Sequence, residues 1–259
     1  MIINNKLKKY IEQNIFPSYQ KNDTGHNLEH IKYVINRSLM FAKEVPDINY
    51  NMVYTIASYH DIGHYIDAKN HEKISSEILE QDKNLKRFFT DDEIIIMKEA
   101  VADHRASLKT EPRSIYGKIV STADRSMSLN KTIKRTFTYR LANNPNDTLD
   151  DLIEDARNHI NKKYSKNGYA IKKVYFKDKD FENFINECTK LVKNKDLFKQ
   201  KFIEINKINT SEESLSFIFN EIKKYNEQMT FDELIYAVYI KLDTDLPISA
   251  IKEKIINFN

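Results

Sequence analysis

Residues 57–66 read ASYHDIGHYI, and they place a histidine and an aspartate side by side where an apolar helical pattern ends. Val53 and Ile56 recur at helical spacing, and the stripe that they begin ends on His60. Taking a carboxylate such as Asp61 out of water is costly unless the charge is paired or bound to a cation. A divalent cation removes this cost because it binds the carboxylate and a neutral imidazole together. The pair therefore predicts part of a metal site.

The adjacent spacing of His60 and Asp61 also predicts the end of a helix. Neighbouring side chains on a helix diverge by about 100°, so both can reach one ion only near a helix end. We expect Gly63 to supply that end, because a residue without Cβ lets the chain leave a helix in a left-handed conformation. His60 and His64 have i, i+4 spacing, which can itself chelate a metal on a helix, but Gly63 between them disfavours this.

The composition predicts an all-α protein. The chain has 259 residues, of which 41% are hydrophobic and 31% charged, and it is long enough to bury a sizeable core. Four glycines and five prolines leave little turn material for an all-β fold. One segment, YAIKKVYF at residues 169–176, has the composition of a short strand.

Other apolar stripes of helical period also lead to side chains that can bind metal. One stripe follows His30, a second runs into His104, and a third carries Asp124 at its edge. Several candidate ligands are thus aimed inward from separate helices. Helix starts are indicated by three capping-box patterns, Thr90 with Glu93, Thr210 with Glu213 and Thr230 with Glu233.

The charge distribution suits an anionic ligand. The net charge is only +3, but Lys98 to Arg140 contain ten Lys and Arg against four Asp and Glu. A solvated helix face has the same composition, so this second interpretation stays open. Interleaved aromatic residues and nucleic-acid motifs are missing from the sequence, which disfavours nucleic-acid binding. The single cysteine, Cys188, is interpreted as a small buried hydrophobe.

The sequence also bears on location. Its N-terminus has no signal-peptide pattern, and apolar runs such as Ile94 to Met97 are too short to span a bilayer. We therefore expect a cytoplasmic protein that does not associate with membranes. The sequence makes no prediction about the oligomeric state.

Three segments together resemble the HD-domain metal-dependent phosphohydrolases, a superfamily named for an adjacent His-Asp pair. They are GHNLEHIKYV (25–34), ASYHDIGH (57–64) and KIVSTADR (118–125), in the order H…HD…D. The resemblance covers approximately residues 20–140 and implies a helical bundle with an additional C-terminal helical region. In the first segment His30, rather than His26, precedes the apolar stripe and takes the ligand position. The ligands that the resemblance implies are His30, His60, Asp61 and Asp124.

Two more segments resemble those that donate further histidines in members with a two-metal centre. They are HEKISSEIL (71–79) and EAVADHRAS (99–107), and the resemblance implies that His71 and His104 bind a second ion, with Asp61 as a bridge. Such members include bacterial hydrolases that split dinucleoside polyphosphates symmetrically. The alternative is a one-metal enzyme in which both histidines contact the substrate phosphate.

The expected domains are an HD-type phosphohydrolase domain at 1–145 and a helical extension at 146–259. The interruption LANNPNDTLDD, residues 141–151, suggests this boundary, and the extension either packs on the main domain or forms a small separate unit. The resemblance carries no function onto the extension.

Many members have lysine where this chain has His64, so a phosphate contact there is expected to be weaker or pH-dependent.

The expected function is hydrolysis of a phosphate ester or anhydride, with a nucleotide as the small-molecule substrate. Mixed nitrogen and oxygen ligation suits Mn, Fe, Co, Ni or Zn better than Mg or Ca, and one or two ions are expected. Metal-bound hydroxide would attack phosphorus. The residues expected to act in catalysis are His60, Asp61, His104 and Arg125, with Arg125 holding phosphate. Glu29 and Asp67 both remain candidates for a general base.

Two alternatives belong to other functional classes. Some HD-fold proteins use a mixed-valent di-iron pair as oxygenases, and their ligand set overlaps the one described above. A signalling or scaffold protein could bind a nucleotide or metal without turnover, with the apolar C-terminal helices as a partner surface. Such helices face a core by default, which favours simple packing.

Overall fold

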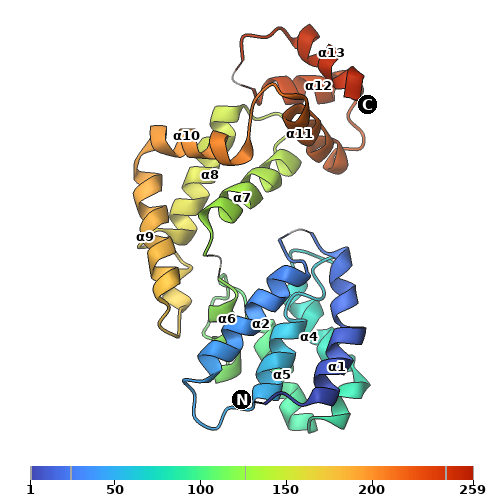
Figure 1. Ribbon diagram of the computed structural model, residues 1–259, viewed down its shortest axis with the longest axis vertical. Coiled ribbons are helices and arrows are strands. Elements are labelled where there is room, and N and C mark those ends of the chain that lie inside the picture. Colours follow the sequence, from blue (N-terminus) through green and yellow to red (C-terminus); the bar gives the residue numbers. More distant parts are fainter. Residues whose placement is uncertain (1, 24, 126, 243, 259) are drawn as a thin grey trace. The chain divides into compact units, whose positions relative to one another are not determined.

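The computed structural model describes residues 2–23, 25–125, 127–242 and 244–258, and their regular elements are all helices (Figure 1). This confirms the all-α prediction. None of the described helices is long and apolar enough to cross a membrane. The α-helices are α1 (Asn5–Asn14), α2 (Leu28–Ala42), α3 (Tyr50–Tyr59), α4 (His71–Gln81), α5 (Asp91–Ala102), α6 (Ile115–Ala123), α7 (Leu129–Asn143), α8 (Leu149–Tyr164), α9 (Lys179–Lys193), α10 (Lys195–Asn206), α11 (Glu212–Tyr225), α12 (Phe231–Tyr239) and α13 (Ile248–Phe258). Short 3-10 helices are η1 (Phe16–Lys21), η2 (Lys83–Arg87) and η3 (Ile171–Lys173).

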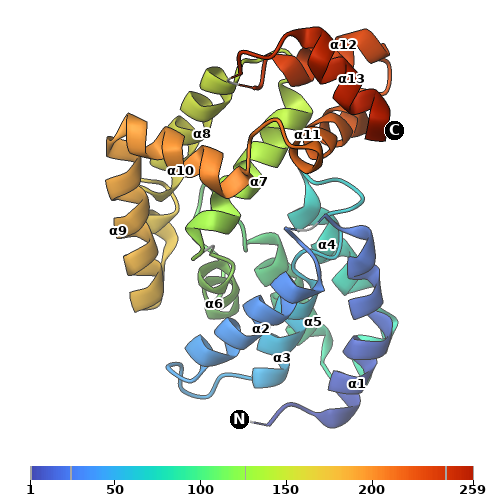
Figure 2. The same ribbon diagram turned by 45° about the horizontal axis from the view of Figure 1, so that its top comes forward.

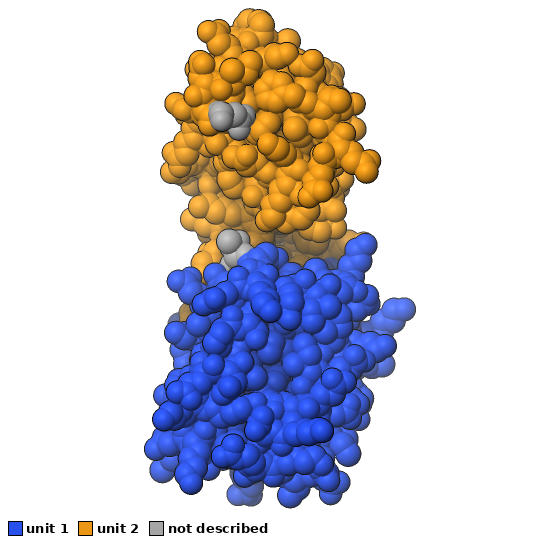
Figure 3. Space-filling view, turned by 90° about the vertical axis from the view of Figure 1, so that its right-hand side faces the viewer, with its two compact units in different colours: residues 1–125, 169–179 blue, residues 126–168, 180–259 orange. Residues whose placement is uncertain are grey.

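The chain divides into two compact units, which Figure 3 colours separately. Unit 1 consists of residues 1–125 and 169–179, and unit 2 of residues 126–168 and 180–259. The expected boundary at residue 145 falls inside unit 2, because α7 packs with α8, α10 and α11. A catalytic domain followed by a helical extension remains our proposal for the organisation of the chain.

The core of unit 1 forms around α3, which contacts α1, α2, α4, α5 and α6. Figure 2 shows α2, α3 and α5 side by side. The predicted apolar stripes face this core: Ile31, Val53, Ile56 and Met97 are fully buried. Burial of each such side chain contributes about 1.5–3 kcal/mol, which holds the helix ends that carry the candidate ligands in fixed positions.

Two of the three predicted capping boxes are confirmed. The Thr90 and Thr230 side chains accept from the backbone N–H of Glu93 and Glu233, and each glutamate accepts from its cap in return. The box at Thr210 is wrong, because Ser211 is the N-cap of α11. Ser211 offers the same hydroxyl one position later, and this shift also moves the third helical position from Glu213 to Ser214.

The predicted strand at residues 169–176 is also wrong. Its middle forms the 3-10 helix η3, and no strand lies beside it in the described ranges. Its alternating apolar and aromatic residues instead pack on unit 1, where the Phe176 ring stacks on Phe41 at 5.2 Å between centroids. The Tyr175 backbone N–H donates to Thr122 Oγ1 at 3.2 Å. The pattern therefore reflects packing against helices and not pairing in a sheet.

Gly63 has a different role from the one expected. Helix α3 does end before it, but the described glycines all lack a positive φ, so the left-handed exit is wrong. A Cβ at residue 63 would lie 2.6 Å from Ile74 Cγ2 and 2.9 Å from the Ser75 backbone nitrogen. The Gly63 N–H donates to Ser75 Oγ at 2.9 Å. Glycine is required here because the chain passes close to the start of α4.

Unit 2 has its own aromatic core. Phe137 of α7 lies against Phe202 of α10, with ring centroids 5.4 Å apart. The C-terminal helices α11, α12 and α13 contact one another, and α11 also contacts α7. Phe219, Leu234 and Val238 are buried among them. These helices use their main apolar faces for packing within the unit, as an amphipathic helix does by default.

Candidate metal centre

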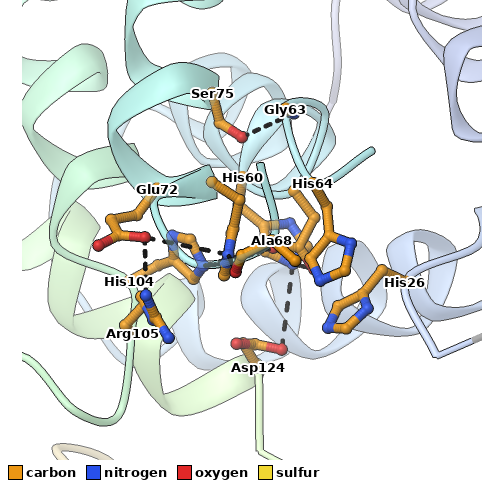
Figure 4. A network of polar contacts seen from close by, with 12 residues as sticks. His26, His60, Gly63, His64, Ala68, Glu72, Ser75, His104, Arg105 and Asp124 are labelled. Atoms are coloured by element: carbon orange, nitrogen blue, oxygen red, sulfur yellow. Dashed lines mark hydrogen bonds and ion pairs between the residues drawn. The ribbon is translucent and has the colours of Figure 1, made fainter. Parts of the chain in front are cut away.

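The six predicted ligands lie together in unit 1, and each comes from the end of a helix. His30 is in the first turn of α2, and His71 is the first residue of α4. His60 and Asp61 directly follow α3, His104 lies two residues beyond α5, and Asp124 directly follows α6. Figure 4 shows His60, His104 and Asp124 directed toward one another from three parts of the chain.

The first group of candidate ligands contains His30, His60 and Asp124. Their ligand atoms all lie within 4.8 Å of one another. His30 Nε2 is 3.1 Å from Asp124 Oδ1, and His60 Nε2 is 4.0 Å from the same oxygen. Asp61 Oδ2 also faces this group, at 3.5 Å from His30 Nε2 and 3.2 Å from His60 Nε2.

The second group contains Asp61, His71 and His104, all of them buried. The other oxygen of Asp61, Oδ1, lies 3.2 Å from His71 Nε2 and 3.4 Å from His104 Nε2. The two histidine Nε2 atoms are only 3.3 Å apart. Asp61 thus presents one oxygen to each group, which is the arrangement of a carboxylate between two cation sites.

Backbone carbonyls fix the orientation of three of these imidazoles. The Nδ1 atoms of His60, His71 and His104 lie 2.8, 2.9 and 2.6 Å from the carbonyl oxygens of Ala57, Ala68 and Val101. A carbonyl oxygen only accepts, so each Nδ1 must donate a proton. In a neutral ring the lone pair then sits on Nε2, and all three Nε2 atoms point into the centre. Metal-binding histidines are typically oriented in this way.

The electrostatics of the centre follow from burial and close charges. Burial raises the pKa of the Asp61 carboxyl, but the surrounding histidines, His60 foremost, outweigh it and hold the pKa well below its ordinary value. Burial lowers the pKa of His104, and this effect exceeds the attraction of Asp61. Burial also acts against a charged His30, but Asp124 and Asp61 outweigh it and raise its pKa to about 9. The carboxylates of Asp61 and Asp124 therefore favour positive charge at the centre.

This donor set fits a divalent transition metal. His60 Nε2 is buried and has no well-aligned hydrogen bond among the described residues, and Asp61 Oδ1 is in the same position. Converging lone pairs and carboxylate oxygens repel one another unless a cation or a proton lies between them. A cation satisfies all of them at once, and mixed imidazole and carboxylate donors suit transition metals.

A third group, Asp23, His26 and His64, lies beside the centre, and sequence analysis did not identify it. Its ligand atoms lie within 4.8 Å of one another. The rings of His26 and His64 are stacked, with centroids 3.6 Å apart and planes at 23° (Figure 4). His26 lies in the loop before α2, and its stacking on His64 follows from the fold and not from a local spacing. Burial and the charge of His26 lower the pKa of His64 to about 4, so His64 is neutral near pH 7.

The arginines and acids near the centre differ in what they contact. Arg125 is only 3% exposed and donates to Ser121 Oγ at 2.9 Å. Arg105 donates to the carbonyl oxygen of Lys69 and to Glu72, which fixes its side chain. Asp67 accepts from the backbone N–H of Lys69 and from the Asn70 side chain, so it holds the turn before α4. Glu29 is exposed in the first turn of α2.

Comparison with known families adds an independent finding. Residues 27–127 match the family model described as HD domain. The comparisons with curated proteins and with solved structures gave no match. All six candidate ligands lie within the matched residues, and the helical fold and the grouped His and Asp side chains agree with this assignment. The comparison therefore supports an HD domain within residues 27–127, which make up less than half of the chain.

Proposed function

We propose that this protein hydrolyses a phosphate ester or anhydride of a nucleotide at the His and Asp centre of unit 1. The observation that carries the proposal is the pair of ligand groups that share Asp61, together with the HD-domain match. When bound, divalent ions polarise a phosphoryl oxygen and lower the pKa of a coordinated water. The superfamily supplies the class of reaction, and the nucleotide is our own proposal.

In this proposal two ions bind. His30, His60 and Asp124 would hold the first together with Asp61, while His71 and His104 would hold the second, also with Asp61. Imidazole and carboxylate donors favour Mn, Fe, Co, Ni or Zn. The buried carboxylate of Asp61 fixes the spacing of the two sites, and the carbonyls that accept from Nδ1 hold the rings in place.

The one-metal alternative, in which His71 and His104 contact the substrate phosphate, is disfavoured by the hydrogen bonds of these rings when both are neutral. Burial lowers the pKa of His71, but Asp61 outweighs it and raises the pKa, which favours the protonated form of this ring. Each ring donates its Nδ1 proton to a backbone carbonyl. In the neutral form Nε2 can then only accept, and a phosphate oxygen is also an acceptor. Two facing Nε2 atoms 3.3 Å apart therefore suit a cation better than an anion.

Binding of the substrate phosphate is assigned to basic residues near the centre. Arg125 directly follows Asp124 and is buried, so its charge acts where water screens it little. An arginine in such a place can stabilise the negative charge that develops on a phosphoryl group. We propose Arg125 as a residue that contacts the reacting phosphate, with His60, Asp61 and His104 acting through the metal.

The test is phosphate release from a panel of nucleotides by the metal-loaded protein, compared with a His60→Gln variant. We expect release from at least one nucleotide, and its loss in His60→Gln with the fold retained. The matched control is His159→Gln, which changes the histidine that lies in unit 2 and should leave activity unchanged. Equal activity of His60→Gln and the unmodified protein contradicts the proposal.

A di-iron oxygenase is the second candidate, because a carboxylate between two histidine groups also suits a pair of iron ions. Oxygen consumption by the iron-loaded protein, with no phosphate release from any nucleotide, would favour this candidate. A protein that binds nucleotide without turnover would retain metal and nucleotide but show neither reaction. The same samples therefore separate all three functions.

A further inference from the structure

The segment 169–179 belongs to unit 1 although it lies outside the matched HD residues. Its far end is fixed by a buried ion pair between Asp178 and Arg37 of α2. Phe176 stacks on Phe41 of the same helix. Because a buried ion pair is costly to break, it holds this segment in its packed position within unit 1.

The anchors of this segment lead to the residues on either side of Asp124. Arg37 Nη1 also donates to the carbonyl oxygen of Ala123 at 2.6 Å and to that of Arg125 at 3.1 Å. The Tyr175 N–H donates to the Thr122 hydroxyl, two residues before Asp124. The segment is therefore held against the end of α6 that presents a candidate ligand.

The near end of the segment meets the chain that follows His104. Lys173 Nζ donates to the carbonyl oxygen of Thr110 at 2.8 Å. Between the two stretches lies an open pocket of about 270 Å³. It is lined by Ala106, Ser107, Leu108, Tyr169, Lys172 and Lys173. The pocket thus adjoins the stretch that follows His104, and its other wall belongs to the segment whose far end is held near Asp124.

The charge of this pocket is positive. Lys172 is exposed, Lys173 is half-buried, and the lining includes no acidic residue. Burial and the nearby charge of Arg125 lower the pKa of Lys173, partly opposed by Glu111. Glu111 is itself paired with Lys118 at 2.9 Å. The neighbouring ammonium groups of Lys172 and Lys173 attract an anion, because lysine binds phosphate as a point charge.

We propose that this pocket binds the outer phosphates of a substrate that carries a chain of phosphates, such as a nucleoside triphosphate. The inference rests on the proposed function for the position of the cleaved phosphate. None of the lining residues is a candidate metal ligand, so a molecule that reaches both places must extend from the centre to the pocket. Lys172 and Lys173 then determine the preference for long over short phosphate substrates.

Kinetics of a double variant, Lys172→Ala with Lys173→Met, test this directly. We expect KM for adenosine triphosphate and for inorganic tripolyphosphate to rise about tenfold, as for loss of a charge-assisted hydrogen bond. Both kcat and the KM for p-nitrophenyl phosphate should stay unchanged. The control is Lys177→Ala, which removes an exposed charge from the same segment outside the pocket. An equal rise for long and short substrates, or no rise, overturns the inference.

Calorimetric binding of inorganic tripolyphosphate separates this inference from the proposed function. One outcome is that the protein binds tripolyphosphate without turnover. If the double variant then loses this binding while Lys177→Ala keeps it, phosphate binding by the pocket is supported and the proposed hydrolysis is not. Equal binding by both variants overturns the pocket. If the double variant unfolds, Lys172→Ala alone provides the same comparison, because Lys172 is exposed and its loss should still weaken the binding of tripolyphosphate. Loss with adenosine triphosphate but not with tripolyphosphate would show recognition of the nucleoside and contradict phosphate binding.

Discussion

A buried lysine of unit 2 and the buried histidines of unit 1 differ in how their polar atoms are satisfied. In unit 2 the ammonium of Lys241 is buried and donates to the carbonyl oxygens of Pro145 and Asp147. In unit 1 the buried imidazoles of His71 and His104 face each other and Asp61 through atoms that carry lone pairs. The first arrangement is satisfied by the protein itself, whereas the second could hold a cation from outside. The contrast separates a structural polar group from a functional one.

The largest expected loss of activity follows substitution of Asp61, the carboxylate that faces both ligand groups. Asp61→Asn should reduce hydrolysis by at least about 100-fold, since even indirect partners of metal ligands contribute 10–100-fold. It should also lower the metal content, because an amide oxygen carries no charge to hold two cations. Phosphate release and elemental analysis measure both effects. Retention of both metal and activity would place the centre elsewhere.

A second comparison is between variants of one buried arginine in each unit. Arg37→Met should lower the free energy of unfolding of unit 1 by roughly 3–5 kcal/mol, because it removes the guanidinium that pairs with the buried Asp178 and donates to the carbonyls of Ala123 and Arg125. Arg140→Met in unit 2 should cost about 1–2 kcal/mol, because its partner Asp155 is exposed and water can solvate it. Urea unfolding of both variants measures the difference. Equal losses would contradict the larger contribution of the buried ion pair in unit 1.

The pH dependence of Lys241 sharpens the same contrast. Burial lowers the pKa of Lys241 to about 8, below its ordinary value of 10.5. Between these values the unfolded chain binds more protons, so stability should rise with pH from about 8 to 10.5, by at most about 1.4 kcal/mol per unit. Below about pH 8 this contribution should be constant. Lys241→Met should remove the rise, and urea unfolding at several pH values compares the two proteins. The same slope in both proteins would assign the pH dependence to another group.

The smallest effect concerns the cysteine of unit 2. Burial raises the pKa of the Cys188 thiol to about 12, and the side chain is fully buried in α9. The thiolate is the reactive form, so Cys188 should not react with Ellman's reagent at pH 8 in the folded protein. Addition of urea should expose one reactive thiol per chain. Rapid reaction without denaturant would show that α9 opens under native conditions.

The sequence predicted the features that depend on local patterns. Apolar stripes of helical period indicated several of the helices, and the residues at their ends indicated side chains directed inward. His60, His104 and Asp124 stood out because each ends or borders such a stripe, whereas the ligand positions of His30 and His71 were implied by the family resemblance. The HD-domain match confirms the family resemblance, and the metal roles of these residues stay predictions.

The remaining features depend on contacts between distant segments. The stretch at residues 169–176 has a strand-like pattern, and only its packing on Phe41 and Thr122 shows why it is not a strand. Gly63 was interpreted through its backbone freedom, whereas the distance to Ile74 explains it. The stacked pair of His26 and His64 joins a loop to the turn after α3, which no local pattern reveals.

Elemental analysis of the purified protein, and of a His71→Ala variant, tests the central claim most directly. The account predicts two divalent transition-metal ions per chain in the unmodified protein and one in His71→Ala. Protein that retains no metal after incubation with Mn, Fe, Co, Ni or Zn would contradict the account, because the facing imidazoles and carboxylates would then form no cation site.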